Sequence, residues 1–137
     1  MQITDVSCAV IVREGMILAA NRNNRVSNSG AWEFPGGKPH EGETPEDCVV
    51  RRVQEELNLN IHVVDELTTF TVQSSADKAY KIYPFLAEIT NGNVELTHHS
   101  RAEWFMPMQL MGLAWPDTDL PIIDEIVSRI FKTGKII

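Results

Sequence analysis

The stretch "EFPGGKPHEGETPEDCVVRRVQEELNLNI", residues 33–61, decides the fold because it joins a glycine turn to a strongly patterned helix. Thr44 is a favourable N-cap, and Pro45 suits the first helical position. We expect the helix to run to about Leu57, with Asn58 as a left-handed C-cap. The stretch therefore predicts one well-defined helix that follows a tight "PGGK" turn.

The helix has two sides of different character, because each residue advances by about 100° around its axis. The apolar side predicts a core face and holds Val49, Val50, Val53 and Leu57. The polar side holds Arg51, Arg52, Glu55 and Glu56. That polar side is either a solvated face with ion pairs at i,i+3 and i,i+4, or an oxygen-rich site for a divalent cation such as Mg²⁺. The charge pattern alone favours the ion pairs.

Composition and charge set the broad class of the protein. The 137 residues suggest a single domain, residues 1–137, with a core that needs no disulfides. Cys8 and Cys48 lack metal-binding spacing, so we expect buried, reduced thiols and a cytoplasmic location. No apolar run reaches bilayer length and no signal peptide is evident, so no membrane association is expected. The net charge of −7 argues against a nucleic acid polymer as partner but permits a small polyanionic ligand.

Strand and turn patterns dominate the rest of the chain. We expect strands at residues 3–13, 16–22, 31–34, 61–74, 79–90 and 104–107. A second helix is expected from about Leu120, where apolar residues recur at helical spacing as far as Ile130. Since strands outnumber helices and alternate with them, the predicted fold class is α/β (α+β), with a mixed β-sheet between helices.

Residues 37–59 resemble the Nudix box, G-x5-E-x7-R-E-U-x-E-E-x-G-U, in which U is an aliphatic residue. The spaced positions that fit the pattern are Gly37, Glu43, Arg51, Val53, Glu55, Glu56 and Leu59. The surrounding chain is similar to the MutT-like branch of the Nudix family almost from end to end, including "WEFPGGK" before the box and "WPDTDLP" before the last helix. The resemblance implies a Nudix-type α/β/α sandwich, and it favours the metal interpretation of the polar helix side.

Two positions depart from the box. Asn58 stands where the box has its last Gly, which is a mild change because Asn tolerates a left-handed backbone. Arg52 stands where a Glu follows the box arginine. In relatives that Glu contributes to metal binding or to activation of the attacking water. A guanidinium in its place could neutralise Glu55 and Glu56 and compete with a metal ion.

The resemblance implies a Mg²⁺-dependent enzyme, with Mn²⁺ as an alternative ion, that hydrolyses a nucleoside triphosphate to the monophosphate and pyrophosphate. The expected substrate types are (d)CTP and oxidised 8-oxo-dGTP, and the expected role is the removal of damaged or unwanted nucleotides. A nucleotide-binding module with weak or no hydrolase activity is the alternative, because Arg52 replaces the box Glu. Family members are often monomers or dimers, so we expect a monomer or a homodimer.

The resemblance also implies roles for single residues. The expected metal ligands are Gly36, through its carbonyl oxygen, Glu55, Glu56 and Glu103. The expected catalytic residues are Glu43 and Glu103, as candidates for the general base, and Arg51, which holds Glu55 or a neighbour in place. The expected substrate contacts on the phosphate side are Arg22, Lys38 and the turn residue Gly37.

Phe34 and the loop "WPDTDLP" flank the expected base pocket. Asp119 aligns with the residue that hydrogen-bonds the base edge in MutT-like relatives. A carboxylate suits the N4 amino group of cytosine, and it also suits the N1 and N2 protons of a guanine-type base. Asp119 favours a pyrimidine, since Asn is usual in bacterial relatives that read oxidised guanine. An N-cap of the last helix is the alternative role. The histidines without ligand spacing, expected at the surface or in loops, are His40, His62, His98 and His99.

Overall fold

The computed structural model describes residues 1–21 and 31–137 of the chain. Its strands are β1 (Gln2–Arg13), β2 (Met16–Asn21), β3 (Trp32–Glu33), β4 (Gly36–Gly37), β5 (Leu59–Glu66), β6 (Phe70–Ser75), β7 (Lys78–Gly92) and β8 (Arg101–Phe105). Its helices are α1 (Pro45–Leu57), the short 3₁₀ helix η1 (Pro107–Gly112) and α2 (Leu120–Thr133). Among the described residues, no helix combines the length and apolar character that crossing a membrane requires.

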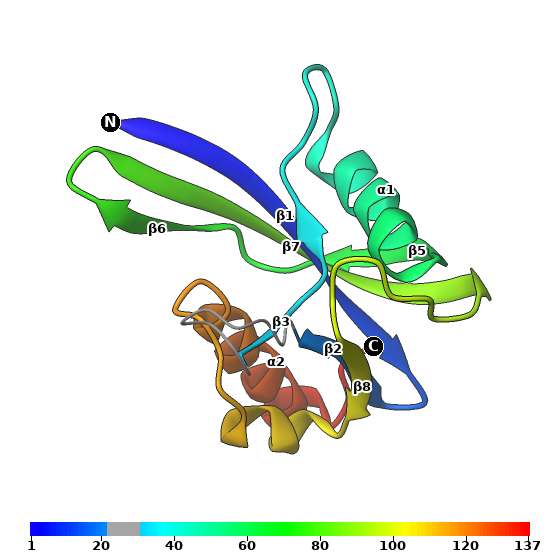
Figure 1. Cartoon of the computed structure of the whole chain (residues 1–137). Coiled ribbons are helices and arrows are strands. Elements are labelled where there is room, and N and C mark those ends of the chain that lie inside the picture. The colour runs from blue at the N-terminus through cyan, green and yellow to red at the C-terminus, as the bar shows by residue number, and fades with distance from the viewer. Residues whose placement is uncertain (22–30) are drawn as a thin grey trace.

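The strands form a mixed sheet with the order β3-β2-β1-β7-β5 (Figure 1). β1 and β7 run parallel, with Gln2 opposite Lys78 at one end and Ile11 opposite Ala87 at the other. The other pairs are antiparallel, and they place β4 beside β1, β6 beside β7 and β8 beside β2. This order brings the two-residue strand β4 against the middle of the central strand β1.

Side chains of β1 alternate between two cores, because successive residues of a strand point to opposite faces. The core on the α2 side includes Cys8, Val10, Val12, Ile122, Ile123 and Ile126. The core on the α1 side includes Ala9, Ile11, Val49, Val53 and Leu57. The sheet therefore lies between α1 and α2 (Figure 1), and the predicted mixed sheet between helices is confirmed.

The expectation of one strand over residues 61–74 was wrong. The chain instead forms β5 and β6, which pair with different parts of β7. Between them Leu67 is buried, and its amide donates to the carbonyl of Pro84. The amide of Thr68 donates to the Glu125 carboxylate of α2 at 2.9 Å. These tertiary contacts interrupt a segment whose local pattern favours a continuous strand. The last strand was also misplaced, since β8 begins at Arg101, before the predicted start.

Candidate active site

Helix α1 places the polar cluster, and its ends are defined by local capping. The Thr44 side chain accepts a hydrogen bond from the Asp47 amide at 3.1 Å, and Pro45 begins the helix. Asn58 closes it in the left-handed conformation, with φ of 59°. Val53 and Leu57 are fully buried beneath the helix. The predicted helix bounds and core face are confirmed, and hydrogen bonds with Glu56 and Arg52 join the polar side of α1 to the turn that contains β4.

The turn approaches β1 so closely that a side chain cannot be accommodated at Gly36. A Cβ atom there would lie 2.0 Å from the carbonyl oxygen of Ser7. The Gly36 amide donates to Oε1 of Glu56 at 3.0 Å, which joins the turn to the last part of α1. Glu56 is only 1% exposed, and its pKa is raised above the usual range chiefly by this burial.

Arg51 binds Glu43 and thereby holds the loop before α1 against the helix. Its Nε donates to Glu43 Oε2 at 2.8 Å and its Nη2 donates to Glu43 Oε1 at 2.9 Å. The amide of His40 donates to the same Oε1 at 2.9 Å. The hydrogen bonds from Arg51, and then that from His40, lower the pKa of Glu43 to about 2. A carboxylate with both oxygens occupied and so low a pKa is poorly suited to act as a general base near neutral pH.

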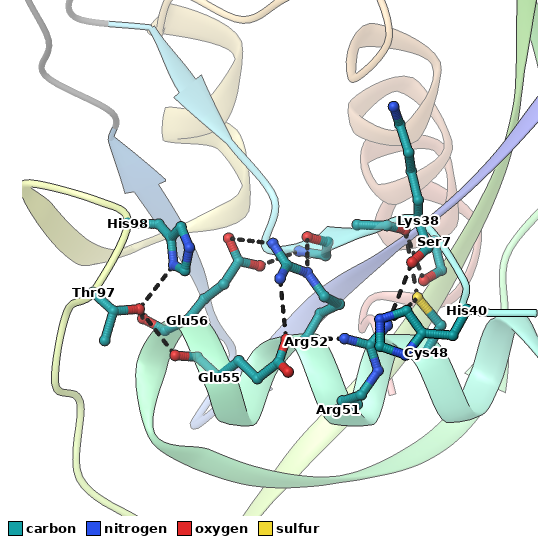
Figure 2. Close-up of polar contacts among 12 residues, drawn as sticks. Ser7, Lys38, His40, Cys48, Arg51, Arg52, Glu55, Glu56, Thr97 and His98 are labelled. Carbon is teal, nitrogen blue, oxygen red and sulfur yellow. Dashed lines mark hydrogen bonds and ion pairs between the residues drawn. The ribbon is translucent and has the colours of Figure 1, made fainter. Parts of the chain in front are cut away.

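Arg52 lies among three of the four groups that were expected to bind a metal ion (Figure 2). Its Nε donates to the Gly36 carbonyl at 3.3 Å, and its Nη1 donates to Glu55 Oε1 at 3.0 Å. Its Nη2 lies 3.8 Å from Glu56 Oε2. Arg51 also donates to Glu55 Oε1, at 2.9 Å. The predicted ion pairs of the helix surface are therefore present, and they use the same carboxylates.

These side chains do not fit a divalent ion as they are arranged. Gly36, Glu55 and Glu56 are brought together as expected, but a guanidinium takes the central place. Within the described residues, no group of three or more His, Cys, Asp or Glu side chains could hold a metal ion. Hard cations need several free carboxylate or carbonyl oxygens. Here the Gly36 carbonyl and Glu55 Oε1 already accept hydrogen bonds from Arg52 or Arg51, and Glu56 Oε2 faces Arg52 at 3.8 Å.

Glu103 is not brought to this cluster. Its neighbours Ala102 and Trp104 pack against the core on the α1 side. Because strand residues alternate, the Glu103 side chain points to the opposite face of the sheet. That side chain is 48% exposed, and its nearest partner among the described residues is Arg101, at 3.9 Å. The position of Glu103 thus gives no support to its expected roles as metal ligand and general base.

No pattern in the sequence indicates that one of the histidines is buried. His99 lies in the loop between β7 and β8, one of the two expected locations, but it is only 6% exposed. Its Nε2 lies 2.6 Å from Glu33 Oε1 and 3.9 Å from Glu56 Oε2. The pair His99 and Glu33 is separated by 66 residues and shows no spacing that a sequence pattern could detect. His98 remains exposed and contacts Thr97 (Figure 2).

A cavity of about 240 Å³ extends from the Gly36–Gly37 turn to Asp119. Phe34 forms part of its wall and stacks on Trp115, with ring centroids 4.8 Å apart. Glu33 also lines this cavity, so it lies between the polar cluster and Asp119. The structure therefore brings Phe34, Gly37 and Asp119 together around one pocket.

Asp119 is 8% exposed, and its Oδ2 has no hydrogen-bond partner among the described residues. Burial, and then the charge of Glu33, raise its pKa to about 7. Hydrogen bonds from the Phe34 amide and the Thr118 side chain oppose this rise. Asp119 occupies the N-cap position of α2, but its side chain makes no capping hydrogen bond. The N-cap alternative is therefore not realised, and an acceptor remains available to a group in the pocket.

One expected phosphate contact, Lys38, lies outside this geometry. Lys38 is exposed, and its side chain extends away from Glu55 and Glu56 (Figure 2). Arg22 lies outside the described residues. Cys8 and Cys48 are buried and unpaired, as expected.

Comparison with known proteins gives concordant results. A family model described as the NUDIX domain matches residues 1–127. The CTP pyrophosphohydrolase of Escherichia coli (strain K12) is 24% identical over 128 residues, which cover 93% of this chain and 94% of that protein. The 8-oxo-dGTP diphosphatase of Proteus vulgaris is 40% identical over 45 residues, or 33% of this chain and 40% of that protein.

Solved structures show the same fold. The solution structure of the E. coli ORF135 protein superposes with a TM-score of 0.83 at 22% identity, and the match covers 98% of this chain and 94% of that one. The crystal structure of a MutT NUDIX hydrolase from Burkholderia pseudomallei superposes with a TM-score of 0.80 at 24% identity. That match covers 92% of this chain and 99% of the other.

Proposed function

The chain belongs to the NUDIX family, and from that premise we propose that it is a MutT-like nucleoside triphosphate pyrophosphohydrolase. The reaction would convert a substrate such as (d)CTP or 8-oxo-dGTP to the monophosphate and pyrophosphate. Relatives named CTP pyrophosphohydrolase and 8-oxo-dGTP diphosphatase support this substrate class. The proposed role is the removal of unwanted nucleotides in the cytoplasm, by a monomer or a homodimer.

The observation that carries the proposal is the buried, incompletely bonded Asp119 carboxyl at the end of the cavity. Buried polar atoms are nearly always hydrogen-bonded, so one that is not points to a ligand. Phe34, which stacks on Trp115, supplies an aromatic wall beside it that suits a planar base. The opposite end of the cavity is formed by Gly36 and Gly37, beside the charged residues of α1.

The protonation state of Asp119 selects between the two expected bases. A protonated carboxyl offers one donor and one acceptor, which matches N3 and the N4 amino group of cytosine. An ionised carboxylate offers only acceptors, which match the N1 and N2 protons of a guanine-type base. With a pKa of about 7, Asp119 favours cytosine below neutral pH and a guanine-type base above it.

A panel of nucleoside triphosphates, assayed for pyrophosphate release at pH 5.5 and pH 8.5, tests this function. The reactions include Mg²⁺ or Mn²⁺, because Nudix hydrolases generally use divalent metal ions. We expect KM for CTP to be lower at pH 5.5. Asp119→Asn, whose amide supplies one donor and one acceptor at every pH, should keep CTP turnover and lose this pH dependence. Asp119→Ala should raise KM for CTP about tenfold or more. Equal KM values in all three proteins would contradict the assignment.

A nucleotide-binding module with weak hydrolase activity is the second candidate. The supporting observation is that Arg52 contacts Gly36, Glu55 and Glu56, while Arg51 occupies both oxygens of Glu43. The carboxylates of this cluster are thereby paired with guanidinium groups, which disfavours their action on a water molecule. Turnover in the same panel that matches ordinary family members would exclude this candidate. Slow turnover that Arg52→Glu rescues would support it.

A further inference from the structure

The guanidinium of Arg52 directs its three nitrogens to three different acceptor groups. Nε points to the Gly36 carbonyl, Nη1 to Glu55 and Nη2 to Glu56 (Figure 2). One acceptor belongs to the β4 turn, and the other two belong to the last turn of α1. Arg52 thus joins the turn to the helix in the way that a shared cation would.

The backbone of Gly37 leaves the space through which the Arg52 side chain runs. A Cβ atom at Gly37 would lie 2.4 Å from Arg52 Nε and 3.1 Å from its Cδ. The Arg52 side chain therefore runs directly across the bare backbone of Gly37 and is only 25% exposed. Moving it into solvent would remove the Arg52 charge from beside Glu56, a carboxylate that is 1% exposed. Such a separation is costly, because it leaves a buried charge without a nearby opposite charge.

The net charge of the cluster is consistent with a cation at the position of the Arg52 guanidinium. Glu43, Glu55 and Glu56 face the guanidiniums of Arg51 and Arg52, so one excess negative charge remains if all are ionised. A Glu in place of Arg52 would leave three excess negative charges. Divalent ions are held by several carboxylates whose charge is not otherwise neutralised. The cluster of this chain is therefore poorly suited to attract such an ion.

We propose that Arg52 is a fixed cation that replaces the protein-bound divalent ion and contacts the polyphosphate of the nucleotide directly. A guanidinium has five N–H donors, and the hydrogen bonds to Gly36 and Glu55 use two of them, while Nη2 faces Glu56 at 3.8 Å. The remaining donors suit phosphate oxygens, to which Arg binds strongly. Nucleotide binding at this site is then independent of divalent metal. The inference rests on the proposed nucleotide substrate but concerns binding, not turnover.

The test measures two binding reactions by titration calorimetry: Mn²⁺ alone, and inorganic triphosphate in the presence of EDTA. The proteins are wild type, Arg52→Gln and Arg52→Glu. The matched control is Arg129→Gln, which removes a guanidinium paired with Asp65 at 2.6 Å on another part of the molecule. Thermal melting of each protein establishes that it is folded before titration.

Wild type and Arg129→Gln should bind triphosphate in EDTA with equal affinity, and Arg52→Gln should bind it about tenfold more weakly. Arg52→Glu should bind Mn²⁺ at least about tenfold more tightly than wild type, because two units of charge change within the cluster. Equal Mn²⁺ affinity in wild type and Arg52→Glu would overturn the inference, as would triphosphate binding that EDTA abolishes in wild type. Failure of the hydrolase proposal is separate, since it would appear as absent pyrophosphate release while triphosphate still binds.

Discussion

At the scale of single residues, Asp119 carries a cost to stability whose sign follows from its pKa. Burial and the nearby Glu33 raise that pKa to about 7 in the folded protein. In the unfolded chain the same carboxyl ionises near its ordinary value, about 3.9. Between these values the folded state binds more protons than the unfolded state, so stability falls as pH rises through this window. The penalty is absent well below pH 4 and fully present above pH 7.

We predict that Asp119→Asn stabilises the protein at pH 8 by roughly 2 to 4 kcal/mol and has little effect at pH 4, because it removes the ionisable group. Urea unfolding at pH 4, 6 and 8 measures the difference. Asp65→Asn is the matched control, since Arg129 lowers the pKa of Asp65. That variant should lose stability at pH 8 and not gain it. A gain for Asp119→Asn that is the same at every pH would contradict the assigned ionisation.

The sequence could predict which residues share the polar side of α1, but it could not predict their partners. Glu55 and Glu56 are fixed by helical spacing, and Gly36 by its place in the turn. Arg52 has a long, flexible side chain, so its spacing permits a solvent-exposed, an ion-paired or a metal-competing position. Its direction is determined by the bare backbone of Gly37, which is a tertiary contact. The contact between Glu33 and His99 is likewise formed only by folding.

At the scale of secondary structure, α1 was predictable because its signals are local. Its N-cap, first-turn proline and left-handed C-cap lie within the segment itself. The division of residues 61–74 into β5 and β6 was not predictable from local pattern. It depends on hydrogen bonds from Leu67 to Pro84 and from Thr68 to Glu125, and the latter residue belongs to α2.

We predict that Asn58→Ala destabilises the protein by about 1 to 2 kcal/mol, because alanine pays a steric cost in the left-handed conformation. The substitution also removes the hydrogen bond from Asn58 Nδ2 to the Asn93 carbonyl, 3.2 Å long. Chemical denaturation measures the loss. Gln54→Ala, at an exposed site one turn earlier, is the control and should change stability by less than about 0.5 kcal/mol. Equal effects at the two positions would show that the C-cap has no special role.

At the scale of the whole molecule, the candidate site lies where segments that are far apart in sequence meet. The β4 turn and α1 supply the charged cluster, and the loop before α2 supplies Asp119. Phe34 and Asp119 both line the cavity, so the segment before β4 and the start of α2 meet there. A nucleotide long enough to fill the cavity should therefore stabilise both regions together.

Amide hydrogen exchange provides a test of this arrangement, because ligand contacts suppress the local openings that allow exchange. We predict that CTP slows exchange both at residues 34–38 and at residues 116–123, whereas inorganic triphosphate slows it only at residues 34–38. β6, which lies outside the cavity lining, is the internal control and should not change with either ligand. In Arg52→Gln, triphosphate should lose its effect and CTP should still protect residues 116–123. Protection of residues 116–123 by triphosphate alone would mean that the polyphosphate, and not the base, occupies the Asp119 end of the cavity.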